Sequence, residues 1–130
     1  MAKILKSVGV MLIALLVFDA IWISAFMQGL YEREIGDSLR SEPNLIAALV
    51  FYLGYPVAAY ILAVKPALSA QSWRTALLNG AVLGATAYGT FAVTNLAVLQ
   101  EWSTTLTVVD TVWGCCVTAA TVALGYRLAR

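Results

Sequence analysis

Residues 106–126 read LTVVDTVWGCCVTAATVALGY, and this stretch decides the fold. It is as long as the roughly 20 apolar residues that a helix needs to cross a bilayer, and Asp110 is its only charged residue. Three further apolar stretches of similar length lie at about residues 7–27, 45–64 and 76–99. The sequence therefore predicts an all-α, polytopic membrane protein whose single domain, residues 1–130, is a bundle of four transmembrane helices.

The composition supports a lipid environment and narrows the chemistry. Hydrophobic residues make up 62% of the chain and charged residues 12%, whereas soluble domains average about 45–50% and about 25%. No basic patch supports nucleic-acid binding, so membrane lipids are the expected partners. The chain has no histidine, and its cysteines are the adjacent pair Cys115 and Cys116. A bridge between neighbouring cysteines is strained, so we expect them to pack rather than to serve redox or soft-metal chemistry, and we predict no metal and no cofactor.

The basic residues predict the orientation. Six of the eight fall on one side of the four spans: Lys3, Lys6, Lys65, Arg74, Arg127 and Arg130. The positive-inside rule then places both termini in the cytoplasm and residues 28–44 in the periplasm, as a solvated loop or, alternatively, a short helix that caps the bundle. The N-terminus resembles a secretory signal, but its apolar stretch is too long and contains Asp19, so we expect an uncleaved first span.

Asp19 and Asp110 are the only acidic residues inside apolar stretches, and each is followed three residues later by a tryptophan, Trp22 or Trp113. The two spans run in opposite directions. If they touch, Trp113 lies level with Asp19, and Trp22 lies level with Asp110. We therefore expect each indole N–H to donate a hydrogen bond to the carboxylate of the other helix.

A carboxyl group within the hydrocarbon costs roughly 2.5–3.5 kcal/mol by insertion scales, so it must face inward and find partners. Counting 1.5 Å per residue puts further polar residues in the same, outer half of the membrane. The predicted ligand-binding site consists of Asp19, Trp22, Tyr52, Thr94, Asn95, Asp110 and Trp113. The alternative is that the two acids only hold helices together by hydrogen bonds.

Several of these patterns together resemble an uncharacterised family of small, four-span bacterial inner-membrane proteins, a domain of unknown function. The resemblance rests on short segments along nearly the whole chain: Asp19-x-x-Trp22, the Tyr31…Ile35-Gly36 segment, Phe51-Tyr52-x-x-Tyr55, Tyr88-Gly89-Thr90, Thr94-Asn95-Leu96-Ala97, Trp102 and Asp110-x-x-Trp113-Gly114. It implies a multi-pass protein of the bacterial cell inner membrane and no established activity. Family members often carry an acid shortly before the Thr-Asn pair, where this chain has Ala92.

Three functions remain open at this stage. The first is binding or proton-linked transport of a small or amphiphilic ligand at Asp19 and Asp110, which favours a homodimer because four spans are few for a transport path. The second is a lipid-modifying membrane enzyme or its accessory subunit, with the two acids as acid and base and with Tyr52 and Asn95 orienting the substrate. The third is a structural or assembly protein.

Overall fold

The computed structural model describes all 130 residues, and every regular element in it is helical. Four helical stretches are long and apolar enough to cross a membrane, as predicted. The first, Ala2–Ser38, consists of α1 (Ala2–Trp22), the π turn η1 (Ile23–Met27), α2 (Gln28–Ile35) and the 3-10 turn η2 (Gly36–Ser38). The others are α3 (Leu45–Ala59) with the π turn η3 (Tyr60–Val64) and α4 (Lys65–Ser69), then α5 (Trp73–Val98), then α6 (Thr104–Ala129).

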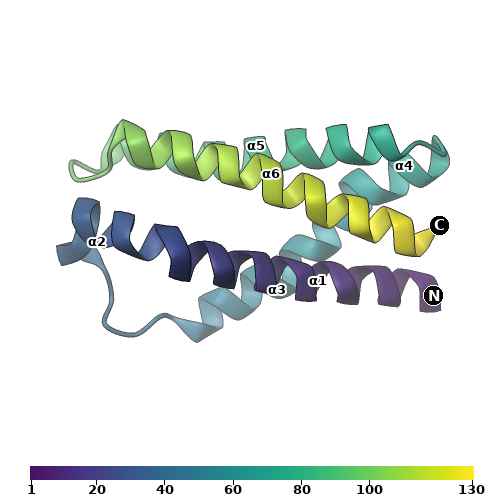
Figure 1. Cartoon of the computed structure of the whole chain (residues 1–130), viewed down its shortest axis with the longest axis horizontal. Helices are drawn as coiled ribbons and strands as arrows, with labels where there is room; N and C mark the ends of the chain where they lie inside the picture. Colours follow the sequence, from purple (N-terminus) through teal and green to yellow (C-terminus); the bar gives the residue numbers. More distant parts are fainter.

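The first helix extends well past the predicted span. Residues 28–38 continue it, so the first connection is mostly helical rather than a solvated loop, and only residues 39–44 lack helical structure. Ser38 Oγ donates to Glu101 Oε2 at 2.6 Å and ties the end of this extension to the loop between α5 and α6. Both chain ends lie at the opposite end of the bundle (Figure 1).

Three of the long helices begin at a side-chain cap. The side chains of Asn44, Ser72 and Ser103 accept hydrogen bonds from backbone N–H groups three residues on, at 3.1–3.2 Å. Asparagine and serine are favoured at this position because their oxygens satisfy N–H groups that have no partner within the helix. These caps fix where α3, α5 and α6 start.

Helices α5 and α6 form the tightest pair in the bundle, and glycines make this possible. A Cβ added at Gly84 would overlap the backbone of Gly114, and one added at Gly80 would lie 2.9 Å from Ala119 Cα. Small residues let membrane helices approach closely enough for extensive van der Waals contact. The close approach also fixes the rotation of α5, because the glycine face must point at α6.

The end of the bundle that holds the termini is filled by apolar side chains. Met11, Tyr60, Val64, Val122 and Tyr126 belong to one buried cluster there, contributed by α1, η3 and α6. The outside of the bundle is apolar as well: Ile13, Leu49, Val82 and Val108, one from each long helix, are all more than half exposed. Exposed apolar surface on this scale suits a lipid solvent.

At the opposite end, α3 separates from α5. The backbone of helix α3 lies against α1, whereas its continuations η3 and α4 lie against α5 and α6. Pro56 and the π turn η3 interrupt the regular hydrogen bonding of this span, and helices change direction at such features. The oblique course of α3 is visible in Figure 1, and it leaves a cleft among α1, α3, α5 and α6.

Candidate functional site

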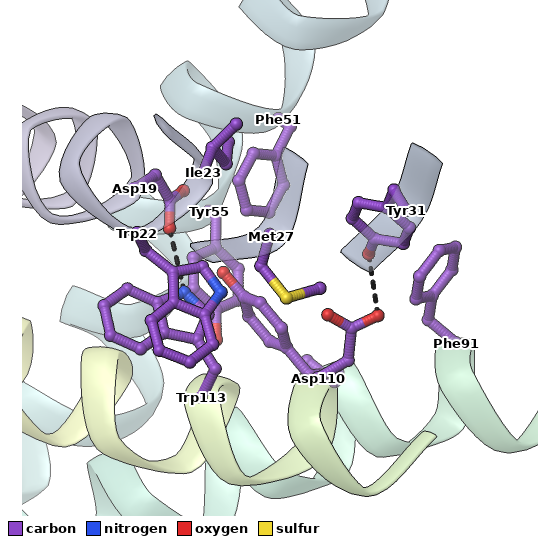
Figure 2. Close-up of a pocket in the computed structure, with 12 residues that line it drawn as sticks. Asp19, Trp22, Ile23, Met27, Tyr31, Phe51, Tyr55, Phe91, Asp110 and Trp113 are labelled. Carbon is purple, nitrogen blue, oxygen red and sulfur yellow. Dashed lines mark hydrogen bonds between the residues drawn. The ribbon is translucent and has the colours of Figure 1, made fainter. Parts of the chain in front are cut away.

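The cleft has a volume of about 440 Å³ and apolar walls. Asp19 and Asp110 are its only acidic residues, and no basic residue lines it. Figure 2 shows the two carboxyl groups separated by aromatic rings and by Met27. The full lining is Asp19, Trp22, Ile23, Met27, Tyr31, Phe51, Tyr55, Ala87, Tyr88, Phe91, Asp110 and Trp113.

Asp19 is a buried carboxyl group with both oxygens engaged. It is 7% exposed. The Trp113 indole Nε1 donates to Oδ1 at 3.1 Å, and the Tyr52 hydroxyl donates to Oδ2 at 2.9 Å. The predicted hydrogen bond from the indole of the fourth span to the carboxylate of the first is therefore confirmed. These two bonds connect α1 to α3 and to α6.

Asp110 is equally buried, at 6% exposed, but it has one partner. The Tyr31 hydroxyl donates to Oδ2 at 2.8 Å. The other oxygen, Oδ1, accepts no hydrogen bond from the protein, and Figure 2 shows it turned toward the middle of the cleft. Asp110 thus keeps one oxygen without a protein partner, whereas Asp19 keeps none.

The predicted bond from Trp22 to Asp110 is wrong. The Trp22 indole stacks on that of Trp113, with ring centroids 4.3 Å apart and planes within 1° of parallel. Its Nε1 is buried and has no hydrogen-bond partner. Tyr31 takes the expected place at Asp110, so the two tryptophans form a stack instead of two symmetrical carboxylate contacts.

The π turn η1 explains why Tyr31 reaches Asp110. Asp19, Ile23, Met27 and Tyr31 all line the cleft at a spacing of four residues. On a regular α-helix each such step would rotate the side chain by about 40°, so Tyr31 would leave the face of Asp19. A π turn takes more residues per turn and removes part of this drift. Such turns often occur at functional sites.

Tyr31 and the aromatic walls were missed as site residues. Phe51 and Tyr55 lie one turn apart on α3, with ring centroids 5.2 Å apart, and the Tyr55 hydroxyl shares a 2.7 Å hydrogen bond with Thr118 Oγ1. Tyr88 packs directly on Gly114, because a Cβ added at Gly114 would overlap the ring of Tyr88. For Phe51 and Tyr55 the available signal was their spacing of one turn beside Tyr52.

Five of the seven predicted site residues come together. Asp19, Trp22, Asp110 and Trp113 line the cleft, and Tyr52 bonds to Asp19. Thr94 is exposed and Asn95 half-buried, and neither lines the cleft. They lie on α5 about one turn beyond Phe91, which is the last residue of that helix to line the cleft.

Two other sequence features, Ala92 and the cysteine pair, fall outside the cleft. Ala92 is fully buried in a cluster with Met27, Leu30, Trp102 and Leu106, and it does not line the cleft. Cys115 and Cys116 are unbridged. The structure contains no group of three or more His, Cys, Asp or Glu side chains that could hold a metal ion.

Comparison with known proteins gives the family and nothing on activity. Residues 4–127 match the family described as "Predicted membrane protein (DUF2177)". The match spans nearly the whole chain, so the protein belongs to this family, as the resemblance indicated. Neither the curated proteins nor the solved structures yield a match.

Proposed function

We propose that this member of the DUF2177 family binds a small amphiphilic ligand in its cleft, and that the ligand and a proton compete for Asp110. The observation that carries the proposal is the open Oδ1 of Asp110 in an otherwise apolar cleft of about 440 Å³. Ligand sites are typically clefts of about 300–1,000 Å³ with apolar walls and a few placed polar groups. Ionisable residues within a membrane usually mark such sites.

The ligand enters sideways from the lipid. Ile23 and Phe91 line the cleft and are 47% and 53% exposed, so their outer sides contact lipid tails. An amphiphile can then place its apolar part among the aromatic rings and its polar part at Asp110. The N–H of the cleft-lining Trp22 is buried without a partner, and such an orphan donor costs about 1–3 kcal/mol.

The basic residues favour a site in the outer half of a bacterial inner membrane. Lys3, Lys6, Lys65, Arg74, Arg127 and Arg130 flank the spans on the side of the chain ends. The positive-inside rule puts that side in the cytoplasm. Residues 39–44 are then periplasmic, and the cleft faces the outer leaflet.

Exchange of a proton for a ligand at one carboxyl group is the elementary step of proton-linked transport. Four helices enclose little space for a path across the membrane, so the transport form of the proposal requires a homodimer. The exposed side of α3, with Leu45, Ile46, Leu49 and Val50, is available for a second copy.

The two alternative functions have less support. An enzyme with two carboxyl groups as acid and base needs both within reach of the substrate, and each oxygen of Asp19 already accepts a hydrogen bond, from Tyr52 or from Trp113, which leaves Asp19 less available than Asp110. A purely structural role fits Asp19 well. It does not account for the open oxygen of Asp110 or for the cleft beside it.

Photolabelling tests the proposal. The protein in lipid nanodiscs is illuminated with a diazirine-bearing octanol, a neutral amphiphile, and labelled peptides are identified by mass spectrometry. We expect saturable labelling at Ile23, Met27 and Phe91. Ala87→Phe fills the cleft from an exposed position on α5 and should reduce this labelling at least several-fold, while Ala97→Phe, exposed on the same helix outside the cleft, should not.

Labelling spread evenly over the lipid-facing surface, or equal labelling of the two alanine variants, would contradict the proposal. Both substitutions add the same side chain to the same helix. Any difference between them therefore reports on the cleft rather than on hydrophobicity or on stability.

A further inference from the structure

We infer that the ligand is a lipophilic organic cation, such as an ammonium or phosphonium ion with an apolar body. This inference rests on the proposed function and names the chemical class that the cleft recognises. Three features of the cleft support it: the imbalance of charge, the aromatic walls and the geometry of the open carboxyl oxygen.

The charge imbalance is the first feature. Two carboxyl groups line the cleft, from α1 and α6, and the other elements contribute only neutral groups: Tyr31 from α2, Tyr55 from α3 and Tyr88 from α5. No lysine or arginine reaches it. A buried charge without a partner is costly, so an ionised Asp110 requires a positive charge that the protein does not supply.

The walls are the second feature. Seven of the twelve lining residues are aromatic: Trp22, Tyr31, Phe51, Tyr55, Tyr88, Phe91 and Trp113. The faces of aromatic rings attract cations, with tryptophan the strongest, and the attraction grows when water is excluded. Tyr55 and Tyr88 meet edge to face at 6.1 Å, and the parallel Trp22–Trp113 pair lines the same cleft.

The open oxygen is the third feature. Asp110 keeps its Tyr31 bond on Oδ2, so a cation at Oδ1 adds a partner without displacing one. Small hard ions suit the cleft poorly, because Mg²⁺ and Ca²⁺ require six or more oxygen ligands and the cleft is mostly carbon. A bulky, weakly hydrated organic cation meets both the carboxylate and the rings.

Competition against the diazirine-octanol label tests the inference with ions of matched shape. Tetraphenylphosphonium and tetraphenylborate have the same four phenyl groups and opposite charges, and both partition into lipid. We expect the phosphonium ion to displace the cleft label saturably and the borate ion not to displace it. In Asp110→Asn, displacement by the phosphonium ion should need about tenfold more of it.

Two further variants keep the test informative. Asp110→Glu retains the charge and should restore displacement by the phosphonium ion, even if Asp110→Asn folds poorly. Glu42→Gln removes an exposed acidic charge outside the cleft and should leave displacement unchanged.

The outcomes separate the inference from the proposed function. If both ions displace the label equally, or if Asp110→Asn responds to the phosphonium ion as the wild type does, the cleft binds amphiphiles and the cation inference is wrong. If the neutral label never concentrates in the cleft and the phosphonium ion quenches no tryptophan fluorescence, both are wrong.

Discussion

Asp19 and Asp110 carry the same sequence motif and are buried to the same extent, yet their surroundings differ. Asp19 accepts from Trp113 and Tyr52, one donor on each oxygen. Asp110 accepts only from Tyr31 and leaves Oδ1 facing the cleft. The hydrogen bonds on both oxygens of Asp19 join α1 to α3 and α6, whereas Asp110 has an oxygen with no protein partner that faces the cleft. We assign the structural role to Asp19 and the functional role to Asp110.

The largest effect is expected from Asp19→Ala. The substitution leaves the Trp113 indole N–H and the Tyr52 hydroxyl without their acceptor, so the free energy of unfolding should fall by about 1–3 kcal/mol. Reversible unfolding in mixed micelles, followed by circular dichroism, measures the change. If the variant is as stable as the wild type, Asp19 does not have the structural role that we assign to it.

Cation binding at Asp110 should depend on pH. A cation at Oδ1 replaces a proton, so affinity for tetraphenylphosphonium rises with pH through the titration of Asp110, by up to about tenfold per pH unit. Tryptophan fluorescence quenching measures the affinity. In Asp110→Asn the same titration should be flat; a slope that persists in this variant would mean that another group exchanges the proton.

The two tryptophans give a matched pair of substitutions. Trp113→Phe keeps an aromatic ring against Trp22 but removes the hydrogen-bond donor to Asp19. The indole N–H of Trp22 has no acceptor, so Trp22→Phe loses no hydrogen bond. We therefore expect Trp113→Phe to lower the free energy of unfolding by about 1 kcal/mol more than Trp22→Phe. The same unfolding measurement compares them. Equal losses would indicate that packing alone decides the contribution of both rings.

The smallest change in stability is expected for Asp110→Asn. Asparagine keeps an acceptor for the Tyr31 hydroxyl, so the free energy of unfolding should stay within about 0.5–1 kcal/mol of the wild type. Binding should fall nonetheless. Loss of stability comparable to that of Asp19→Ala would make Asp110 a second structural contact and erase the difference between the two sites.

The sequence predicted the four helices and the bond from Trp113 to Asp19 because both follow from hydropathy and depth. It missed Tyr31 because a π turn, which changes the residue's direction, has no simple sequence signal. The prediction of Thr94 and Asn95 rested mainly on their depth in the membrane. The direction in which they point depends on the rotation of α5 about its axis. The close contact of Gly80 and Gly84 with α6 sets this rotation, and it brings Ala87, Tyr88 and Phe91 to the cleft.

The claim that Asp110 is the binding carboxyl group can be tested by infrared difference spectroscopy with and without tetraphenylphosphonium. We expect the cation to remove the infrared band of one protonated carboxyl group, and we expect this change to disappear in Asp110→Asn and to persist in Asp19→Asn. A change that disappears in Asp19→Asn instead, or the absence of any carboxyl change on binding, would contradict it.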